Sequence, residues 1–465
     1  MPATMHRELA RIVGAERVLE APASSPYNHD AARRRGVEGR AEAVVLPGSA
    51  AEVAALVAWC YAHDVALVAR GGGTGMMGGA VATHGGIVCS LERLVRVREL
   101  EPALWRMLPE AGVSTRDVQR LARENGLFFG PDPGACEQSQ IGGNVATNAG
   151  GPHALKYGVT GAWVAGLEVV LAPGELVELG GWAGKDVAGY DLKSLMIGSE
   201  GTLGVITAVR LRLLPAPQAT LALVVFLPTR EQGCAAIGEL LGSGLRPAVL
   251  DFLDSETLAM TAASYPADAP AAGFALIVEL DGTRAEVKDQ RAELSQVLAA
   301  SAIAVQEPAA AELWRWRDGF NGVVTGVRGA KVSEDVAFPI ERLGEGLERF
   351  AQIAGRHGLR SCAWGHGGEG NVHATVLVDP AEEAELDAAQ EVGEELFALV
   401  VELGGSVAGE HGVGWLKRGR LEAQWAPRAL DLHEEIKRAF DPKGLLNPGK
   451  KLARYPAPSP VTSTE

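Results

Sequence analysis

The chain has 465 residues, more than one ordinary hydrophobic core accommodates, so its length predicts at least two domains. Hydrophobic residues make up 47% of the sequence and charged residues 22%, a globular composition that excludes a protein disordered throughout. The net charge of −15 argues against nucleic-acid binding, because a phosphate-binding face needs clustered Lys and Arg.

The first clear element along the chain is a helix near residue 50. Ser49 and Glu52 have the spacing of a capping box, and the apolar residues between 53 and 61 recur at helical spacing. VALVAR (65–70) predicts a short buried strand, and GIVCSLERL predicts a second strand that starts near Ile87. The predicted order is helix, strand, glycine loop and strand.

The glycine loop between these strands, RGGGTGMMGG (70–79), contains a literal G-x-G-x-x-G. That pattern is typical of a nicotinamide dinucleotide site, in which a helix follows the loop. Only residues 79–86 separate the pattern from the next strand, and a parallel crossover needs a dozen or more residues, usually with a helix. We therefore reject a nicotinamide site, treat Glu92 at the ribose-binding spacing as coincidence, and keep the loop as a phosphate-binding candidate.

Two further glycine-rich segments follow. PDPGACEQSQIGGNVATNAGG (131–151) has no helical periodicity, and MIGSEGTLGVITAVRLRLLP (196–215) places its glycines before an alternating β run. Segments of this kind usually stay ordered only when something lies against their backbone. Three of them close together in the sequence predict one extended ligand that carries phosphates.

The pattern of elements changes after PAPQ (215–218). Strand-like TLALVVFLP, a helix-like stretch at 230–242 and strand-like GFALIVELDG (273–282) predict an α+β domain built on an antiparallel sheet. We place the domain boundary near 217, giving a first domain at 1–217 and a second at 218–455. Residues 381–403 predict a helix that ends at Gly404-Gly405, and residues 456–465 predict a disordered tail.

Two histidines flank a glycine-rich turn in the second domain. WGHGGEGNVHATVLV contains His366 and His373, and His373 starts an alternating strand. Farther along, GGSVAGEHGVG supplies Glu410 and His411 between glycines. Two imidazoles and a carboxylate suit Zn2+ or a similar divalent ion with an open position for substrate. The alternative is a set of separate loop histidines that make surface hydrogen bonds.

Cysteine spacing and hydropathy predict the cellular compartment of the protein. The five cysteines are widely separated and never form C-x-x-C, which indicates reduced thiols and argues against a Cys-ligated iron–sulfur cluster within this chain. The first residues contain no apolar h-region, and no window approaches the ~18 apolar residues of a membrane span. We expect a cytoplasmic protein with no transmembrane segment; attachment to a membrane through a partner stays open.

Nine segments, taken in order, carry a resemblance to a known family. They are RGGGTGMMGGAV (70–81), PDPG (131–134), IGGNVATNAGGPHALKYGVT (141–160), GYDL (189–192), IGSEGTLGVIT (197–207), SEDVAFP (333–339), GHGGEGNVH (365–373), GEHGVG (409–414) and LNPGK (446–450). Together they resemble the FAD-linked oxidases of the vanillyl-alcohol oxidase type, in the branch with D-lactate dehydrogenases, D-2-hydroxyglutarate dehydrogenases and the FAD subunit of glycolate oxidase. The resemblance implies an α+β fold: a two-subdomain FAD-binding domain, then a C-terminal α+β cap domain with an antiparallel sheet and a return to the FAD domain.

The resemblance also implies the residues that bind FAD. The glycine loop would wrap the FAD pyrophosphate with backbone N–H groups, which requires glycine where the backbone approaches closely with unusual φ. The full set is Arg70, Gly71, Gly72, Gly73, Thr74, Gly75, Gly78, Gly79, Pro131, Ser139, Gly142, Gly143, Asn144, Thr147, Asn148, Gly150, Glu200, Gly201, Val205, Ile206 and Asn447. Relatives with covalent flavin attach it to a His in this loop, which here has none, so we expect noncovalent FAD.

At the second site the resemblance makes His366, His373 and Glu410 the metal ligands, with Zn2+ favoured over Mn2+ or Fe2+. It makes His411 the catalytic base and Arg317 in WRWRDGFN the arginine that binds the substrate carboxylate. For Arg317 the alternative is an ion pair with a neighbour such as Asp318, with Arg315 and Arg328 as rival clamps. For His411 the alternative is a supporting contact to Glu410.

Three positions depart from the resemblance. Glu369 stands where the family's turn usually has Asp, a mild change. Thr375 replaces an Asn of the hydroxyglutarate enzymes, and Ser333 replaces a Lys that those enzymes use near the distal carboxylate. The last two departures argue against 2-hydroxyglutarate as the substrate.

These assignments predict an enzyme that oxidises a small D-2-hydroxy acid, D-lactate or glycolate favoured, by hydride transfer to flavin. The alternatives are a D-2-hydroxyglutarate dehydrogenase, the FAD subunit of a multi-subunit glycolate oxidase, and a non-enzymatic flavin subunit with a structural metal. Electrons must leave to O2 or to an external acceptor: a quinone, a cytochrome, an electron-transfer flavoprotein or an iron–sulfur subunit. The sequence leaves the acceptor open, and also leaves open whether the chain forms a homodimer.

Overall fold

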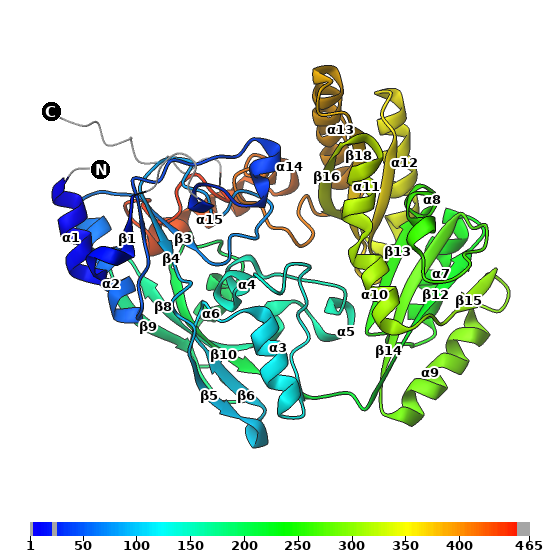
Figure 1. Ribbon diagram of the computed structural model, residues 1–465, viewed down its shortest axis with the longest axis horizontal. Coiled ribbons are helices and arrows are strands. Elements are labelled where there is room, and N and C mark those ends of the chain that lie inside the picture. The colour runs from blue at the N-terminus through cyan, green and yellow to red at the C-terminus, as the bar shows by residue number, and fades with distance from the viewer. Residues whose placement is uncertain (1–2, 21–25, 453–465) are drawn as a thin grey trace. The chain divides into compact units, whose positions relative to one another are not determined.

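The structure is a computed structural model that describes residues 3–20 and 26–452, so the predicted tail at 456–465 lies outside the described residues (Figure 1). The chain divides into two compact units. Unit 1 combines three stretches: one that runs to Gly150, Val159–Ala216, and one from His411 onward. Unit 2 contains Gly151–Gly158 and Pro217–Glu410.

The described residues of unit 1 form two larger sheets and one two-stranded sheet. The first has the order β1-β2-β4-β3 and the second, wholly antiparallel, has the order β5-β6-β10-β8-β9. Its strands are β1 (Val18–Leu19), β2 (Ala43–Val45), β3 (Leu67–Arg70), β4 (Ile87–Ser90), β5 (Val97–Glu101), β6 (Arg106–Pro109), β8 (Val164–Leu171), β9 (Glu175–Gly180) and β10 (Val205–Arg212), with a separate pair, β7 (Leu127–Phe128) and β11 (Leu214–Pro215). Its helices are α1 (Ala3–Val13), α2 (Ala50–Ala62), α3 (Thr115–Glu124), α4 (Ile141–Thr147), α6 (Leu192–Met196), α14 (Leu421–Gln424) and α15 (Pro427–Phe440).

The predicted helix near residue 50 is confirmed as α2. The Ser49 side chain accepts a hydrogen bond of 3.2 Å from the Glu52 backbone N–H, whereas the Glu52 side chain accepts from Gly48 at 2.7 Å. The predicted apolar face of α2 packs in one core cluster with residues of β2, β3 and β4. The capping contact therefore fixes where the helix begins, and burial of this face holds it against the first sheet.

The glycine loop connects two parallel strands. β3 pairs with β4 in parallel, with Leu67 opposite Ile87, although residues 71–86 between them contain no helix. The missing helix agrees with the sequence analysis, but the connection is long enough for parallel pairing in an irregular form. The second glycine-rich segment differs more clearly, because residues predicted to lack a helix form α4. Close packing explains the glycine within this helix, since a Cβ on Gly142 would lie 2.5 Å from the Ala111 side chain.

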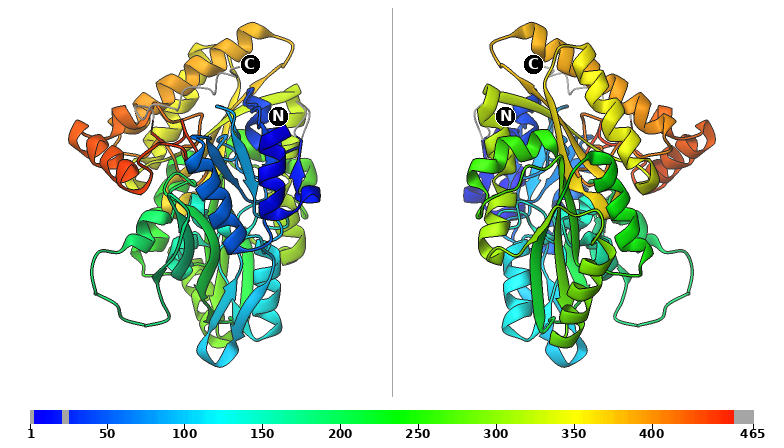
Figure 2. Two further views of the ribbon diagram at one scale, coloured as in Figure 1. Left: turned by 90° about the vertical axis from the view of Figure 1, so that its left-hand side faces the viewer. Right: turned by 90° about the vertical axis from the view of Figure 1, so that its right-hand side faces the viewer.

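The segment between β9 and α6 (residues 181–191) extends away from the sheets of unit 1 as an exposed loop (Figure 2). Val187 and Tyr190 on this loop are 98% and 95% exposed. These side chains therefore contribute nothing to the core of the unit.

Unit 2 is built on one antiparallel sheet of seven strands in the order β15-β12-β14-β13-β17-β18-β16 (Figure 1). The strands are β12 (Ala219–Leu227), β13 (Val249–Asp254), β14 (Phe274–Gly282), β15 (Ala304–Gln306), β16 (Ala330–Ala337), β17 (Ser361–His366) and β18 (Asn371–Val378). The helices are α5 (Ala154–Tyr157), α7 (Arg230–Gly242), α8 (Ser255–Thr261), α9 (Arg284–Val297), α10 (Ala310–Asp318), α11 (Phe320–Arg328), α12 (Leu343–Arg356) and α13 (Glu383–Glu402). The antiparallel sheet and the elements predicted at 220–228, 230–242, 273–282 and 381–403 are confirmed.

Helices cover both faces of this sheet. Ala275 and Ile277 of β14 belong to an apolar cluster with Trp316 of α10. Phe274 points to the opposite face, because side chains alternate along a strand, and an added Cβ on Gly233 of α7 would lie 2.1 Å from its ring. α10 therefore packs on one face and α7 on the other. The α10 face is the one that carries the polar residues described below.

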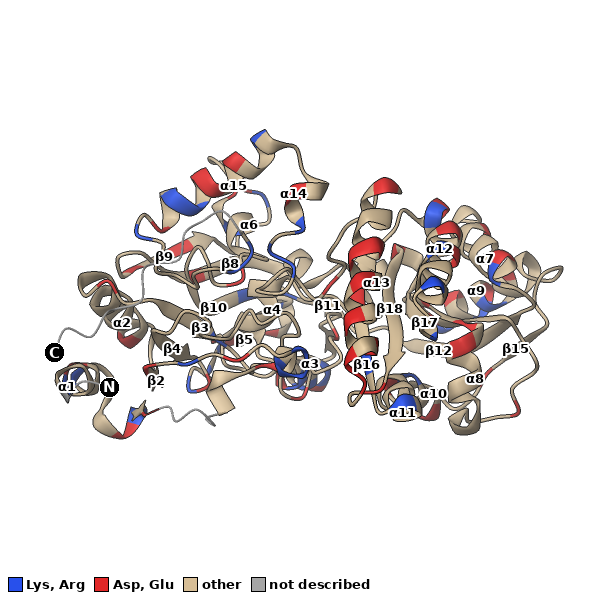
Figure 3. Ribbon diagram, turned by 90° about the horizontal axis from the view of Figure 1, so that it is seen from above, with Lys and Arg blue, Asp and Glu red and all other residues tan. Residues whose placement is uncertain are grey.

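Helices α12 and α13 pack against each other with an ion-paired outer surface. Arg349 and Arg356 of α12 pair with Glu402 and Glu395 of α13 at 2.7 and 2.5 Å. Figure 3 shows the acidic side of α13 along its length. Exposed pairs of this kind add little to stability, so this charge belongs to a solvated helix surface.

Residues 151–158 belong to unit 2, although the residues on either side of them belong to unit 1. His153 Nε2 lies 3.0 Å from Oε1 of Glu279 on β14. Lys156 and Tyr157 both donate to the carboxylate of Asp281 on the same strand. The two acidic side chains share one face of β14, so this short segment is anchored to the sheet by charge and hydrogen bonding.

No described helix is long and apolar enough to cross a membrane. All five cysteines are free thiols.

Candidate functional site

The N–H groups of the glycine loop and the carbonyl groups at its end differ in their hydrogen bonding. Asn447, Arg70 and Lys450 donate side-chain hydrogen bonds of 2.8, 3.3 and 2.8 Å to the carbonyl groups of residues 79, 80 and 81. Within the described residues, no backbone N–H between 71 and 79 donates to a protein acceptor. The loop therefore leaves a run of N–H groups for a ligand, the arrangement that binds a phosphate or pyrophosphate.

Two glycines in this loop are required by close approach. A Cβ on Gly72 would lie 2.0 Å from the carbonyl oxygen of Gln138. Gly73 has φ +68°, and its Cβ would lie 2.1 Å from the Arg70 guanidinium. Any larger residue at either position would push the loop away from its supports.

The predicted flavin segments meet at the loop. An added Cβ on Gly71 would lie 3.5 Å from the Cα of Gly143, and one on Gly79 would lie 3.7 Å from the Glu200 carboxylate. Asn447 Nδ2 also donates to the carbonyl of Glu200 at 2.7 Å. Four segments that are far apart in the sequence thus converge within unit 1.

Two buried acceptors next to the loop are unsatisfied. Gln140 Oε1 and Asn447 Oδ1 have no hydrogen-bond partner, and the first lies 3.6 Å from the Cβ position of Gly71. A ligand with hydroxyl or ring N–H donors would satisfy them, so the residues present fit FAD. Sequence reasoning missed Gln140, which adjoins the quoted IGGN motif, because nothing in the pattern marks its side chain as buried.

Several predicted flavin residues already use their side chains within the protein. Val205 and Ile206 are buried in β10. Ser139 and Asn144 both bond to the hydroxyl of Thr115, at 2.7 and 2.6 Å. Such side chains hold the segment in place, so a flavin contact there would come from the backbone. The flavin-binding roles of these residues stay predictions.

Two more of the predicted residues adopt left-handed backbone without being glycine, Asn148 with φ +52° and Glu200 with φ +54°. The Asn148 side chain accepts from the Gly161 N–H at 2.8 Å. The Glu200 carboxylate accepts from the N–H groups of Val413 and Gly414, at 2.9 and 2.6 Å. These hydrogen bonds hold an uncommon backbone conformation, so the side chains of both residues are fixed by structure.

Lys450 places a buried ammonium group beside the loop. Burial lowers the pKa of Lys450 to about 7; Asp30 and Glu200 oppose that change, and Arg418 adds to it. An anion at the N–H groups of the loop would favour the protonated form.

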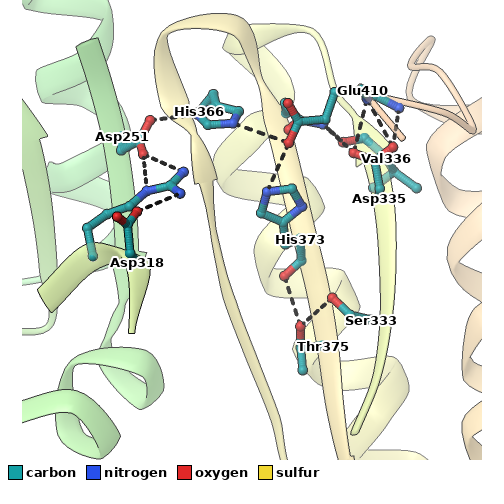
Figure 4. Close-up of polar contacts among 12 residues, drawn as sticks. Asp251, Asp318, Ser333, Asp335, Val336, His366, His373, Thr375 and Glu410 are labelled. Carbon is teal, nitrogen blue, oxygen red and sulfur yellow. Dashed lines mark hydrogen bonds and ion pairs between the residues drawn. The ribbon is translucent and has the colours of Figure 1, made fainter. Parts of the chain in front are cut away.

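In unit 2 the strand register brings the predicted metal ligands together. β13, β17, β18 and β16 are neighbours, with Asp251 opposite His366 and Asp335 opposite His373 (Figure 4). His366 Nε2 and His373 Nε2 each lie 3.4 Å from Oε1 of Glu410. Two imidazole nitrogens and one carboxylate oxygen therefore face one point, a donor set that fits a divalent metal ion.

A second grouping of possible ligands overlaps with this one. Single ligand atoms of Asp335, His373, Glu410 and the next residue along the chain, His411, all lie within 4.8 Å of one another. Asp335 is fully buried, and its oxygens accept from the backbone N–H groups of Gly409 and Glu410 and from Asn371. These hydrogen bonds show that Asp335 holds the Glu410 loop, and the role of His366 as a metal ligand stays a prediction.

Asp335 was present in the quoted SEDVAFP motif, but sequence reasoning gave it no role. The available signal was an acidic residue in the middle of a strand whose next residues are apolar. Burial of such a residue requires hydrogen-bond donors, and Gly409 and Glu410 supply them.

Arg317 pairs most closely with Asp251, an acid that the sequence analysis did not consider. Its Nε and Nη2 both lie 3.0 Å from Oδ2 of Asp251, whereas Asp318 is 4.0 Å away. Asp251 Oδ1 lies 2.7 Å from Nδ1 of His366. Burial alone would raise the pKa of Asp251, but His366 and Arg317 outweigh burial and lower it to about 2. The rival clamp Arg328 pairs with Glu385 instead.

The two positions that depart from the hydroxyglutarate enzymes face each other across neighbouring strands. The hydroxyls of Ser333 and Thr375 lie 2.8 Å apart, and Thr375 also donates to the carbonyl of His373. Lys331, two residues before Ser333, places its ammonium 4.5 Å from the centre of the Trp364 ring. This part of the sheet face is polar, and the Lys331 ammonium lies near it.

Comparison with known proteins gives consistent matches across the chain. Residues 216–451 match the family described as FAD linked oxidases, C-terminal domain, and residues 41–180 match the FAD binding domain family. Glycolate oxidase subunit GlcD of Bacillus subtilis is 33% identical over 434 residues, covering 92% of each chain. D-lactate dehydrogenase of Anaerostipes hadrus is 33% identical (91% of this chain, 92% of the relative), and D-2-hydroxyglutarate dehydrogenase of Xanthomonas citri is 34% identical (90% and 91%).

Solved structures show the same fold at low sequence identity. A p-cresol methylhydroxylase with bound substrate has a TM-score of 0.80 at 17% identity and covers 96% of both chains. A 4-ethylphenol oxidase from Gulosibacter chungangensis has a TM-score of 0.77 at 19% identity and covers 97% of both. These likenesses establish the vanillyl-alcohol oxidase type of fold.

Proposed function

This chain belongs to the FAD-linked oxidases, and we propose that it is a flavin- and metal-dependent dehydrogenase that oxidises a small D-2-hydroxy acid to the 2-oxo acid. D-lactate and glycolate are the favoured substrates. The observation that carries the proposal is the convergence of His366 Nε2 and His373 Nε2 on one oxygen of Glu410. The named relatives that oxidise glycolate and D-lactate support the substrate class.

The proposed reaction removes a hydroxyl proton and a hydride from the neighbouring carbon. When bound, FAD supplies the hydride acceptor and a divalent ion supplies a Lewis acid that lowers the pKa of the hydroxyl. His366, His373 and Glu410 would hold the ion. His411 would take the hydroxyl proton, a role that an imidazole side chain often has in catalysis.

Arg317 would bind the substrate carboxylate. Asp251 contacts Nε and Nη2 of the guanidinium, whereas Nη1 lies 4.0 Å from Oδ1 of Asp318, beyond hydrogen-bond distance. A guanidinium can bind a carboxylate through two parallel N–H groups, which a lysine cannot do. Arg317 thus keeps a donor for the substrate while one of its edges is fixed by protein.

The proposal is tested by mixing the purified yellow protein, without oxygen, with D-lactate, glycolate, D-2-hydroxyglutarate and the L-forms. We expect D-lactate or glycolate to bleach the visible absorbance of the flavin and a chelator to prevent it. If no hydroxy acid bleaches the flavin, the proposed substrate class is wrong. If the chelator has no effect, the metal requirement is wrong.

D-2-hydroxyglutarate is the second candidate substrate. The hydroxyl pair of Ser333 and Thr375 favours a substrate without a second carboxylate, but Lys331 on the same strand offers a cation close to Trp364. Faster bleaching by D-2-hydroxyglutarate, lost in a Lys331→Ala variant, would favour this candidate.

The path of the electrons after flavin reduction is a separate part of the proposal. We propose an external acceptor: a quinone, a cytochrome, an electron-transfer flavoprotein or an iron–sulfur subunit of a glycolate oxidase complex. We also propose that the protein acts in the cytoplasm, with membrane attachment only through such a partner. Reoxidation of the reduced protein by each acceptor class distinguishes them.

A further inference from the structure

One buried carboxylate in unit 2 contacts two side chains of the proposed site at once. Asp251 on β13 is 3% exposed, and its two oxygens face Nδ1 of His366 and the guanidinium of Arg317. We propose that Asp251 is a positioning residue that fixes a metal ligand and the substrate-binding arginine through a single carboxylate. The expected effect on catalysis rests on the proposed function, whereas the positioning role itself is inferred from the contacts of Asp251.

The first half of the role concerns which nitrogen of His366 faces the ligand. An ionised carboxylate only accepts hydrogen bonds, so the Nδ1 of His366, 2.7 Å from Asp251, must carry the proton. Nε2 is then the atom left to face Glu410, at 3.4 Å. A carboxylate behind a metal-binding histidine holds the ring orientation and makes the free nitrogen a better donor.

The second half concerns the orientation of Arg317. Nε and Nη2 both lie 3.0 Å from Oδ2 of Asp251, which fixes the plane of the guanidinium. Arg317 comes from α10, which is held against the sheet by buried residues such as Trp316. The helix sets the position of the arginine and Asp251 sets its direction.

The register of the sheet explains why one residue can do both. Asp251 on β13 lies directly opposite His366 on β17, and it shares the α10 face of the sheet with Leu253. The short Asp251 side chain can therefore contact His366 on the neighbouring strand through one oxygen and Arg317 on α10 through the other. A longer Glu at 251 would displace either His366 or Arg317.

The same strand offers a matched control. Asp254 lies three residues later on β13, and its carboxylate accepts from the backbone N–H groups of Thr257 and Ala363 at 2.8 and 2.7 Å. It caps α8 and contacts neither His366 nor Arg317. Asn is nearly as good as Asp at a helix N-cap. Asp254→Asn therefore keeps an acceptor for the Thr257 N–H, but it removes the charge and the acceptor for the Ala363 N–H, so it controls for loss of a buried carboxylate on the same strand.

The test compares Asp251→Asn with Asp254→Asn in the full chain with FAD bound. Zn2+ affinity is measured by competition with a chromophoric chelator, and kcat and KM are measured with the best substrate. For Asp251→Asn we expect Zn2+ to bind about 10–100-fold more weakly and KM to rise about tenfold. Asp254→Asn should change neither quantity, and both variants should retain flavin.

A further variant separates the two halves. Arg317→Lys leaves the His366 contact of Asp251 intact, so we expect a raised KM with unchanged Zn2+ affinity. Unchanged Zn2+ affinity in a folded Asp251→Asn protein would overturn the inference, as would an equal loss in Asp254→Asn. If Asp251→Asn fails to fold, loss of Zn2+ affinity in Arg317→Lys would overturn the separation of roles. If wild-type protein oxidises no hydroxy acid, the proposed function fails while the Zn2+ comparison still decides the role of Asp251.

Discussion

The glycine loop of unit 1 and the polar cluster of unit 2 prepare for a charged ligand in opposite ways. The loop offers backbone N–H groups, and Asn447, Arg70 and Lys450 bind the carbonyl groups at its end and directly after it, at residues 79–81. The cluster offers side chains linked in a chain of contacts from Arg317 through Asp251 and His366 to Glu410. In the loop, ligand affinity should depend on the space around the backbone and only weakly on most side chains. In the cluster, metal binding and activity should depend on the identity of each side chain.

The largest expected effect is at Glu410, where both imidazoles converge. Glu410→Gln keeps the size of the side chain but removes the charge, so the metal should be lost and kcat/KM should fall at least about 10³-fold. Flavin content should not change. Steady-state kinetics and metal analysis check this result, with Glu369→Gln in the neighbouring turn as the control. Retained metal with full activity would show that the cluster does not depend on this side chain.

The next effect tests space in the loop. Gly72→Ala adds one methyl group at a position where the Cβ would lie 2.0 Å from the Gln138 carbonyl, so the loop must shift and FAD should bind about 100-fold more weakly. Gly181→Ala is the control, because nothing lies within 4 Å of its added Cβ. Flavin retained on purification and flavin titration of the apoprotein measure the difference. Equal affinities would contradict the proposed approach of the pyrophosphate.

A smaller effect concerns proton uptake at Lys450. Because the pKa of Lys450 is about 7 in the free protein, the side chain is mostly neutral at pH 8, and a pyrophosphate at the loop would raise that pKa. FAD binding should therefore take up as much as about one proton at pH 8, and affinity should fall as the pH rises above 7. Calorimetry in buffers of different ionisation enthalpy measures the uptake. Lys450→Met should abolish the uptake and weaken binding about tenfold; persistence of the uptake would assign it to another group.

The smallest effect is expected for a side chain inside the loop. Met76 is 38% exposed, and Met76→Ala keeps the backbone N–H at that position. FAD affinity should change by less than about threefold, since the loop binds through its backbone. A tenfold loss in the same flavin titration would mean that side chains of the loop also bind the cofactor, and the contrast between the two sites would disappear.

Local patterns in the sequence were sufficient for elements whose causes are local. The helices α2, α7 and α13 and the strands β12 and β14 follow from periodicity and turn residues. The helix α4 could not be found in this way, because Gly142 and Gly143 disfavour a helix, and the reason for a glycine at 142 is the close approach of Ala111, a contact with a distant part of the chain.

The residues of the candidate site also differ in whether a local sequence pattern could identify them. His366, His373 and Glu410 were identified because they lie in short glycine-rich motifs that a resemblance could match. Asp251 was not identified, because its role comes from a strand register that joins residues 115 positions apart. The main partner of Arg317 was missed for the same reason: Asp318, adjacent in sequence, lies 4.0 Å away, but the helix directs the guanidinium to Asp251 on the sheet.

The segment near residue 446 pairs with β3. This pairing determines the order in which the two units can fold during synthesis. Leu67 bonds to the backbone of Leu445 and Asn447, and Tyr61 bonds to Asp441, 380 residues away. At about 5–20 residues per second, a ribosome needs roughly 20–80 s to make that stretch. Unit 2, whose main stretch 217–410 is made in the interval, can fold first, whereas the glycine loop gains its Asn447 and Lys450 supports only after residue 450 emerges. A nascent chain interrupted before that point would hold a finished sheet in unit 2 but no assembled flavin cradle, and would expose the edge of β3 to chaperones and proteases.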